Sequence, residues 1–114
     1  MSVRINCSNK EILHVKNAVL RCIYFNICDY IEQSKIVVPE NIDKFLEEDL
    51  YLATEGQDLN IVDSLKTKDE ILFFAALVKT AIEKEQSGPT PFIDEVEKIL
   101  TKFHNEIVTC AIEI

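Results

Sequence analysis

The side chains best suited to nucleophilic, redox or metal chemistry in this sequence are its four cysteines and two histidines. No two cysteines form a CxxC pair, which is the spacing used by zinc ribbons and thiol redox motifs. The histidines, His14 and His104, fall in different predicted helices, and a nucleophile needs its base within hydrogen-bond reach. A zinc site or a cysteine–histidine pair therefore stays open only if the fold gathers distant residues. The cysteines are Cys7, Cys22, Cys28 and Cys110.

We therefore predict no catalytic residue, no metal site and no cofactor. With only two glycines, the chain has no glycine-rich loop that could cradle a phosphate. Carboxylates are plentiful, but no pair is set in apolar surroundings that would raise a pKa for acid–base catalysis. We expect all four cysteines to be reduced thiols that pack as small apolar side chains. Reduced thiols, together with the lack of an apolar signal segment, favour a cytoplasmic location.

A second candidate site is the acid-rich segment at residues 39–63. It holds eight acids and one base, Lys44, so it carries −7 of the formal net charge of −8. Charge gathered in this way predicts a docking surface for a basic protein, because it would speed association and reject wrong partners. The alternative is a solvated acidic face without a partner. Tyr51 lies among the acids and suits an interface anchor. The predicted partner-binding residues are Glu40, Asp43, Glu47, Glu48, Asp49, Tyr51, Glu55 and Asp58.

The element expected to organise the fold is a long helix at about residues 9–33, which is rich in apolar residues between 18 and 31. The tetrapeptide SNKE at 8–11 has the form of a capping box and predicts the start of this helix. Its apolar side is wider than the stripe of a surface helix, which predicts a central position with neighbours on several sides. Phe25 and Cys28 are exceptions, because they point toward the polar side.

Three further helices are predicted around the first, at about residues 39–54, 68–86 and 91–110, with a short helical turn near 59–65. Gly56 suits the end of the second helix, and TKDE at 67–70 is another capping box. Residues 1–7 alternate as a strand does, but an isolated two-stranded ribbon with residues 109–114 would be marginal, so we expect an extended arm. The prediction is an all-α fold, a single-domain bundle of four main helices over residues 1–114, with the first helix central.

Length and charge limit the function. A chain of 114 residues has the length of one domain and can bury a core without a metal or a disulfide. The excess of acids disfavours direct nucleic-acid binding, which depends on lysine and arginine against phosphates. No stretch has the roughly 20 apolar residues that a membrane span needs. We therefore expect no contact with nucleic acid or membrane, and a homodimer stays open.

These observations favour a small acidic cytoplasmic binding protein that inhibits a basic protein partner. We expect an immunity or antidote protein that neutralises a toxin, such as a nuclease, by covering its active site. Size, the lack of catalytic motifs and the gathered acids support this hypothesis. The alternative is a self-associating regulatory or scaffolding helical module without catalytic activity. A small enzyme or metal protein that uses cysteine and histidine is the third hypothesis.

Overall fold

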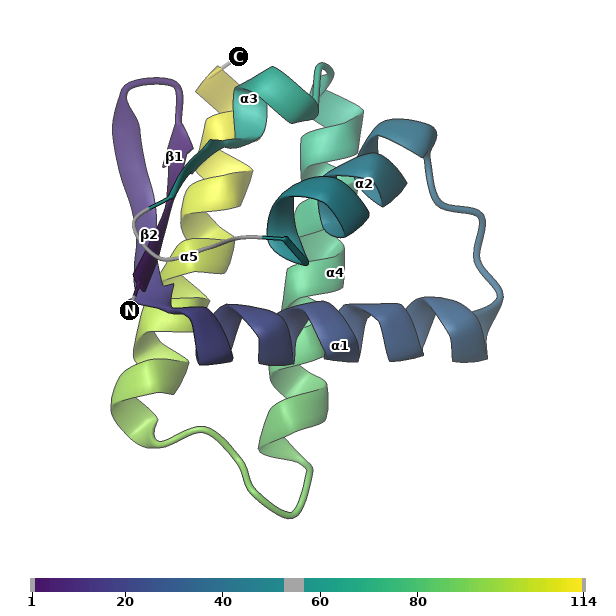
Figure 1. Cartoon of the computed structure of the whole chain (residues 1–114), viewed down its shortest axis with the longest axis vertical. Helices are drawn as coiled ribbons and strands as arrows, with labels where there is room; N and C mark the ends of the chain where they lie inside the picture. The colour runs from purple at the N-terminus through teal and green to yellow at the C-terminus, as the bar shows by residue number, and fades with distance from the viewer. Residues whose placement is uncertain (1, 53–56, 114) are drawn as a thin grey trace.

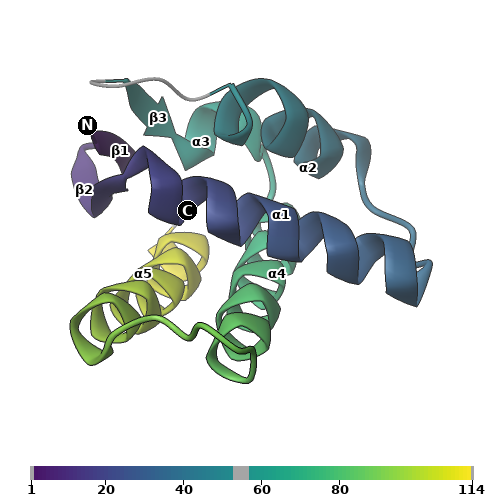
Figure 2. The ribbon, with the colours of Figure 1, turned by 60° about the horizontal axis from the view of Figure 1, so that its bottom comes forward.

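The structure is a mixed α/β fold in which an N-terminal β-hairpin leads directly into a long helix. It is a computed structural model that describes residues 2–52 and 57–113. The elements in chain order are β1 (Ser2–Cys7), β2 (Lys10–Lys16), α1 (Asn17–Ser34), α2 (Glu40–Lys44), the π-helix η1 (Phe45–Leu50), β3 (Asp58–Asn60), α3 (Ile61–Ser64), α4 (Lys68–Gln86) and α5 (Asp94–Glu113). The helices α4 and α5 run side by side, and α1 crosses them (Figure 1). In Figure 2, α1 lies between this pair and a layer formed by α2, α3 and β3.

The prediction of an all-α helical bundle is wrong, because residues 2–16 form a β-hairpin and the first helix begins only at Asn17. The turn places Ser8 at a φ of 56°, so the capping box predicted at residues 8–11 does not form. Ile5 pairs with Leu13, and a shift of register after Ile5 leaves Ile12 as an extra residue in β2. Ile12 and Leu13 are both buried. Two adjacent buried residues fit a helix as well as a bulged strand. The apolar pattern of residues 9–16 therefore predicts helix although these residues form a strand.

The third strand contradicts the predicted extended arm, whereas the helical turn predicted near 59–65 is present but begins at Ile61. β3 pairs with β1 in parallel, with Leu59 opposite Ile5, and the sheet order is β2-β1-β3. Residues 2–7 are therefore the central strand of a sheet. The helical part of the predicted turn is α3, where the Asn60 side chain accepts a hydrogen bond from the Val62 amide at 3.1 Å. At the other end of the chain, α5 continues through Glu113, so residues 109–113 are helical.

Helix α4 begins and ends where the sequence predicts, at Lys68–Gln86, and its capping box is confirmed. Thr67 Oγ1 accepts a hydrogen bond from the Glu70 amide, and Glu70 Oε1 accepts one from the Thr67 amide, both at 3.2 Å. The second predicted helix appears as α2 followed by η1, and its predicted cap, Gly56, lies outside the described residues. The last helix begins at Asp94 rather than at residue 91.

The confirmed capping box makes a prediction. Thr67→Ala should lower the free energy of unfolding by about 1 kcal/mol, because the amide of Glu70 loses its partner. Thr67→Ser keeps the hydroxyl and should stay within a few tenths of a kcal/mol of the wild type. Urea unfolding followed by circular dichroism measures both variants. Equal losses for alanine and serine would show that the hydroxyl does not stabilise the helix.

Three buried phenylalanines connect the helical layers. Phe74 of α4 makes edge-to-face contacts with Phe45 of η1 and with Phe103 of α5, with ring centroids 5.2 and 6.5 Å apart. Each of the three side chains is at most 1% exposed. Because Phe74 contacts a ring of η1 and a ring of α5, a change in its packing would affect three helices at once.

A disulfide fastens the hairpin to the last helix, which corrects the expectation that all four cysteines are reduced. Cys7 at the end of β1 is bonded to Cys110 of α5, and their Cα atoms are 6.1 Å apart. An ion pair of 2.7 Å between Lys10 Nζ of β2 and Glu106 Oε2 also joins the hairpin to α5. Local spacing does not reveal this bond, because the cysteines are 103 residues apart.

Candidate functional site

The predicted partner-binding acids are carried mainly by a helix that changes from α to π geometry. α2 continues into η1, and the Tyr51 amide donates to the Leu46 carbonyl, five residues back, at 3.0 Å. Asp49, which α-helical periodicity would place on the apolar side, is half-buried and accepts a hydrogen bond from Ser64 Oγ at 2.9 Å. π-helical turns are rare and occur often at functional sites. The continuous helix formed by α2 and η1, which we call the acidic helix, is therefore a candidate binding surface.

An aromatic–acid cluster, formed by Tyr24, Phe25, Glu47 and Tyr51, joins this helix to α1. The centroids of the three rings are 5.1 to 6.5 Å apart. Tyr24 is buried, and its hydroxyl donates to Glu47 Oε1 at 3.1 Å. Phe25 and Tyr51 are 54% and 45% exposed. Aromatic residues are enriched among those that dominate protein–protein interfaces.

Further carboxylates lie near the cluster, as the environment of Cys28 shows. Burial raises the pKa of the Cys28 thiol, a hydrogen bond with Tyr24 lowers it, and the charges of Glu47, Asp29 and Asp43 raise it again. The carboxylates of these three residues thus act on one position of α1, one turn after Tyr24. Both α1 and the helix formed by α2 and η1 therefore contribute carboxylates near the cluster, although Asp29 is also ion-paired with Lys84.

The next acids of the helix line a polar hollow of about 340 Å³ between η1 and α3. Glu48, Asp49 and Asp63 contribute carboxylates to its wall, and Lys44 and Lys66 contribute ammonium groups. Lys44 Nζ lies 3.9 Å from Glu48 Oε2. The two lysines offset most of the charge of the three acids in this hollow.

The remaining predicted residues lie elsewhere or outside the described part of the chain. Asp58 belongs to β3, where its Oδ1 is 3.7 Å from the Nε of Arg4, so the structure places it in the sheet and not on the acidic helix. Arg4 is also 3.9 Å from Glu11. Glu40 is exposed in the first turn of α2. Glu55 lies outside the described residues.

Comparison with known proteins adds no identity to this geometry. No family model, curated protein or solved structure matches the chain. The site must therefore be interpreted from its own residues. Within residues 2–52 and 57–113, no helix is both long and apolar enough to cross a membrane.

The histidines lie in separate polar contacts. His14 Nε2 is 2.7 Å from Ser2 Oγ, and His104 Nδ1 is 3.3 Å from Asn105 Oδ1. In the described part of the chain, no three His, Cys, Asp or Glu side chains are grouped so that they could hold a metal ion. These contacts give neither histidine a cysteine partner, so they supply no geometry for a nucleophile and its base.

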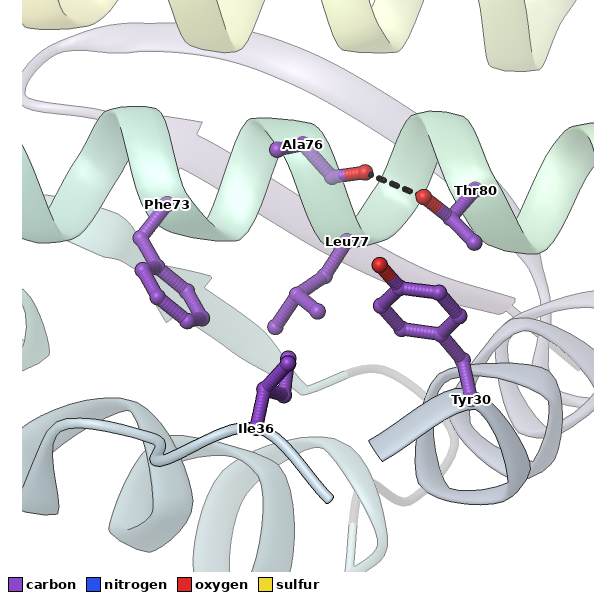
Figure 3. A pocket seen from close by; sticks show the side chains of 6 residues that line it. All are labelled: Tyr30, Ile36, Phe73, Ala76, Leu77 and Thr80. Carbon is purple, nitrogen blue, oxygen red and sulfur yellow. Dashed lines mark hydrogen bonds between the residues drawn. The ribbon is translucent and has the colours of Figure 1, made fainter. Parts of the chain in front are cut away.

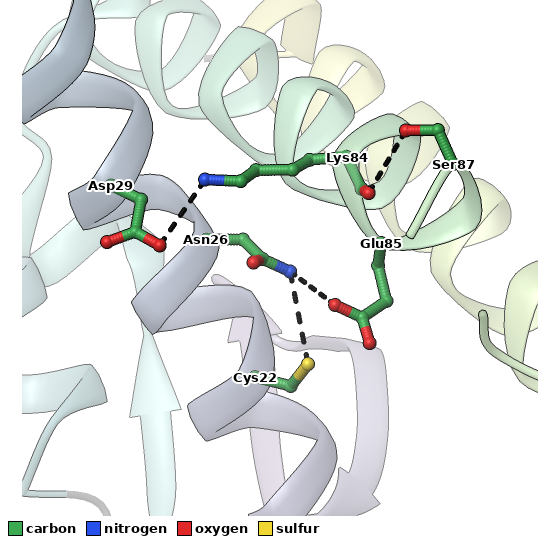
Figure 4. A network of polar contacts seen from close by, with 6 residues as sticks. All are labelled: Cys22, Asn26, Asp29, Lys84, Glu85 and Ser87. Atoms are coloured by element: carbon green, nitrogen blue, oxygen red, sulfur yellow. Dashed lines mark hydrogen bonds and ion pairs between the residues drawn. The ribbon is translucent and has the colours of Figure 1, made fainter. Parts of the chain in front are cut away.

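A polar network joins α1 to α4 (Figure 4). Asn26 Nδ2 donates to Glu85 Oε2 at 2.8 Å, and Lys84 Nζ lies 3.3 Å from Asp29 Oδ2. At the edge of this network, burial raises the pKa of the Cys22 thiol to about 11, and a hydrogen bond to Glu85 and the charge of Glu85 add to the rise. A reactive cysteine needs the opposite shift, because the thiolate is the nucleophile. The network is therefore a structural link between helices.

The raised pKa predicts slow alkylation of Cys22. A rise from 9.0 to about 11 leaves about 100-fold less thiolate at pH 8. The rate of reaction with iodoacetamide should therefore keep rising with pH until about pH 11. Peptide mapping by mass spectrometry follows Cys22 separately from Cys28, and the urea-unfolded chain serves as the control. Equal rates at pH 8 in the folded and unfolded chains would contradict the shift.

An apolar pocket of about 220 Å³ opens between the C-terminal end of α1 and α4 (Figure 3). Sites for small molecules are mostly larger, about 300–1,000 Å³, so this pocket has room for a side chain rather than for a whole ligand. Val37, which follows one of the lining residues in the chain, is 90% exposed. The lining residues are Tyr30, Ile36, Phe73, Ala76, Leu77 and Thr80.

The sequence predicted Tyr51 and the acids as partner-binding residues, but it did not predict that residues of α1 would contact them. A signal was present, because Phe25 points toward the polar side of its helix, where an aromatic ring is unusual. The sequence could not show that the ring of Tyr51 would lie against this ring, with the two centroids 6.5 Å apart, since the residues belong to different elements. The hydrogen bond from Tyr24 to Glu47 likewise depends on the packing of α1 against η1.

Proposed function

We propose that this protein is a non-catalytic binding protein that inhibits a basic protein partner, as an immunity or antidote protein neutralises a toxin. A toxin with a positively charged active site, such as a nuclease, is the partner class that fits best. The observation that supports this most directly is the pair of exposed rings, Phe25 and Tyr51, which both contact Tyr24, whose hydroxyl donates to Glu47. Nothing in this proposal requires contact with nucleic acid or membrane.

The physical argument joins two contributions. Exposed carboxylates on α2 and η1 would attract a basic surface and speed its association, but ion pairs at an exposed rim add little affinity. Aromatic side chains bury a large area at low entropic cost and account for much of the affinity of many interfaces. The aromatic–acid cluster offers both contributions in one place.

The test is capture of a partner from a lysate of the organism that carries this chain. We expect immobilised protein to retain a basic protein, and the purified partner to lose its activity when this protein is added in equal amount. Reversal of three acids to lysine, at Glu47, Glu48 and Asp49, should abolish both capture and inhibition. Circular dichroism checks that the variant is folded.

The matched control reverses three exposed acids on α4 and α5, at Glu83, Asp94 and Glu95. It changes the net charge equally but leaves the acidic helix intact. Recovery of no basic protein, capture that survives the first reversal, or equal losses in both variants would each reject the proposal.

A second candidate function is self-association as a regulatory or scaffolding module. The apolar pocket between α1 and α4, with exposed Val37 beside it, favours this alternative because apolar surface of this kind marks interaction sites. Light scattering distinguishes the two. A stable homodimer that is disrupted by Val37→Asp, but not by the acid reversals, would favour self-association.

The cytoplasmic location also stays a proposal. Structural disulfides are typical of oxidising compartments and rare in the cytoplasm of mesophilic cells, and Cys7 is bonded to Cys110. Cell fractionation with thiols trapped at lysis would show both where the protein resides and whether this bond exists there. Recovery in the periplasm or the medium would reject the cytoplasmic assignment.

A further inference from the structure

We propose that the aromatic–acid cluster is a binding site for an arginine side chain of the partner, an inference that rests on the proposed function. It assigns one side-chain chemistry to the centre of the interface. The guanidinium would stack against Phe25 or Tyr51 and donate hydrogen bonds to Glu47. Exposed acids of the same helix, such as Asp43, would then contact other basic groups of the same partner.

The arrangement of the rings provides the first argument. Phe25 and Tyr51 meet at an interplanar angle of 81°, and both contact the buried ring of Tyr24. Their exposed surface is therefore supported from below by a side chain that is only 6% exposed. A cation within about 6 Å of a ring centroid is attracted by the electrons of the ring face. Rings held by packing lose little freedom when a partner binds.

Charge provides the second argument. The hydrogen bond from Tyr24 reaches Glu47 Oε1, and a carboxylate can accept several hydrogen bonds through its two oxygens. Among the ion pairs of residues 2–52 and 57–113, none joins a cation of this chain to Glu47 or Asp43. The chain's own exposed cation on this part of α1 is Arg21, one turn before Phe25. The carboxylate side of the cluster thus lacks a described ion-pair partner of its own.

Arginine fits this arrangement better than lysine. Its guanidinium is planar, stacks on aromatic rings and presents several N–H donors to a carboxylate. The lysine ammonium is more strongly hydrated and lacks a flat face, so it gains less from the two rings. The cluster should therefore distinguish peptides of equal charge.

The test titrates the whole protein with an acetylated, amidated Gly-Arg repeat peptide of three repeats, followed by NMR of the aromatic side chains. We expect the ring signals of Phe25 and Tyr51 to shift. Phe25→Leu and Tyr51→Leu, which keep apolar volume, should each weaken binding about five-fold, and Glu47→Gln should weaken it similarly. The corresponding Gly-Lys peptide should bind several-fold more weakly.

Control variants are Phe92→Leu, a half-buried aromatic residue ahead of α5, and Glu95→Gln, an exposed acid of α5. Neither should change the affinity. Unshifted ring signals at millimolar peptide, equal binding of the two peptides, or equal losses in control and cluster variants would overturn the arginine site. The proposed function and the arginine site can be distinguished. If the triple reversal on η1 abolishes partner capture while Phe25→Leu and Tyr51→Leu leave it intact, the proposed function stands and the arginine site is rejected.

Discussion

Removing the Cys7–Cys110 disulfide, by changing both cysteines to alanine, is expected to lower the free energy of unfolding by about 2–5 kcal/mol. The bond closes a loop of nearly the whole chain, and a cross-link restricts the unfolded state more when the loop is longer. It also holds β1 against α5, so its loss should loosen the hairpin first. Urea unfolding of the oxidised wild type and the double variant measures the difference.

Two comparisons isolate the bond itself. A reducing agent should destabilise the wild type by a similar amount and leave the double variant unchanged. Cys22→Ala, which removes a free thiol, should not alter the sensitivity of the wild type to the reducing agent. A wild type whose stability is the same with and without the reducing agent would show that the disulfide contributes nothing.

Phe74→Ala is expected to cost about 3–5 kcal/mol, because it removes a fully buried ring and leaves a cavity. The loss should be at the upper end, since Phe74 contacts Phe45 and Phe103 and the space cannot be filled without moving two helices. Such a loss is a large part of the stability of an ordinary domain, about 5–15 kcal/mol. The shift of the urea midpoint between wild type and variant, at an unchanged dependence of the free energy on urea concentration, measures the loss.

Phe74→Leu keeps most of the side-chain volume and should lower the free energy of unfolding by less than about 1.5 kcal/mol. This variant can be measured even if Phe74→Ala does not fold. Ile93→Ala, at a position 66% exposed, is the matched surface control and should change stability by no more than about 0.5 kcal/mol. A loss below about 1 kcal/mol for Phe74→Ala would contradict a tightly packed junction at this residue.

The parts of the fold that the sequence predicted well are those with local signals. Helix α4 was placed correctly because its capping box at Thr67 and Glu70 and its apolar stripe lie within a single element. The acidic helix was also found, although its change to π geometry was not. In both cases the information lies within a few turns of the chain, which is the range over which periodicity and capping act.

The errors come from interactions between distant segments. The strand at residues 10–16 contains apolar residues that satisfy both a helical and a bulged β pattern, and only its pairing with β1 decides between them. The partner of Cys7 and the contact between Phe25 and Tyr51 likewise depend on how elements pack. The candidate site was therefore half predictable: its charges and Tyr51 were visible in the sequence, whereas the contacts of Tyr51 with Tyr24 and Phe25 were not.

The position of β1 in the sheet has a consequence for how the protein is made. β1 is synthesised before its parallel neighbour, which begins at Asp58, and before Cys110, whose sulfur is bonded to Cys7. One edge of β1 therefore stays unpaired at least until residues 58–60 have been synthesised, and such an edge can pair with other chains. We expect ribosome-bound intermediates that lack α5 to depend on chaperones, and fragments truncated before residue 94 to aggregate when expressed alone.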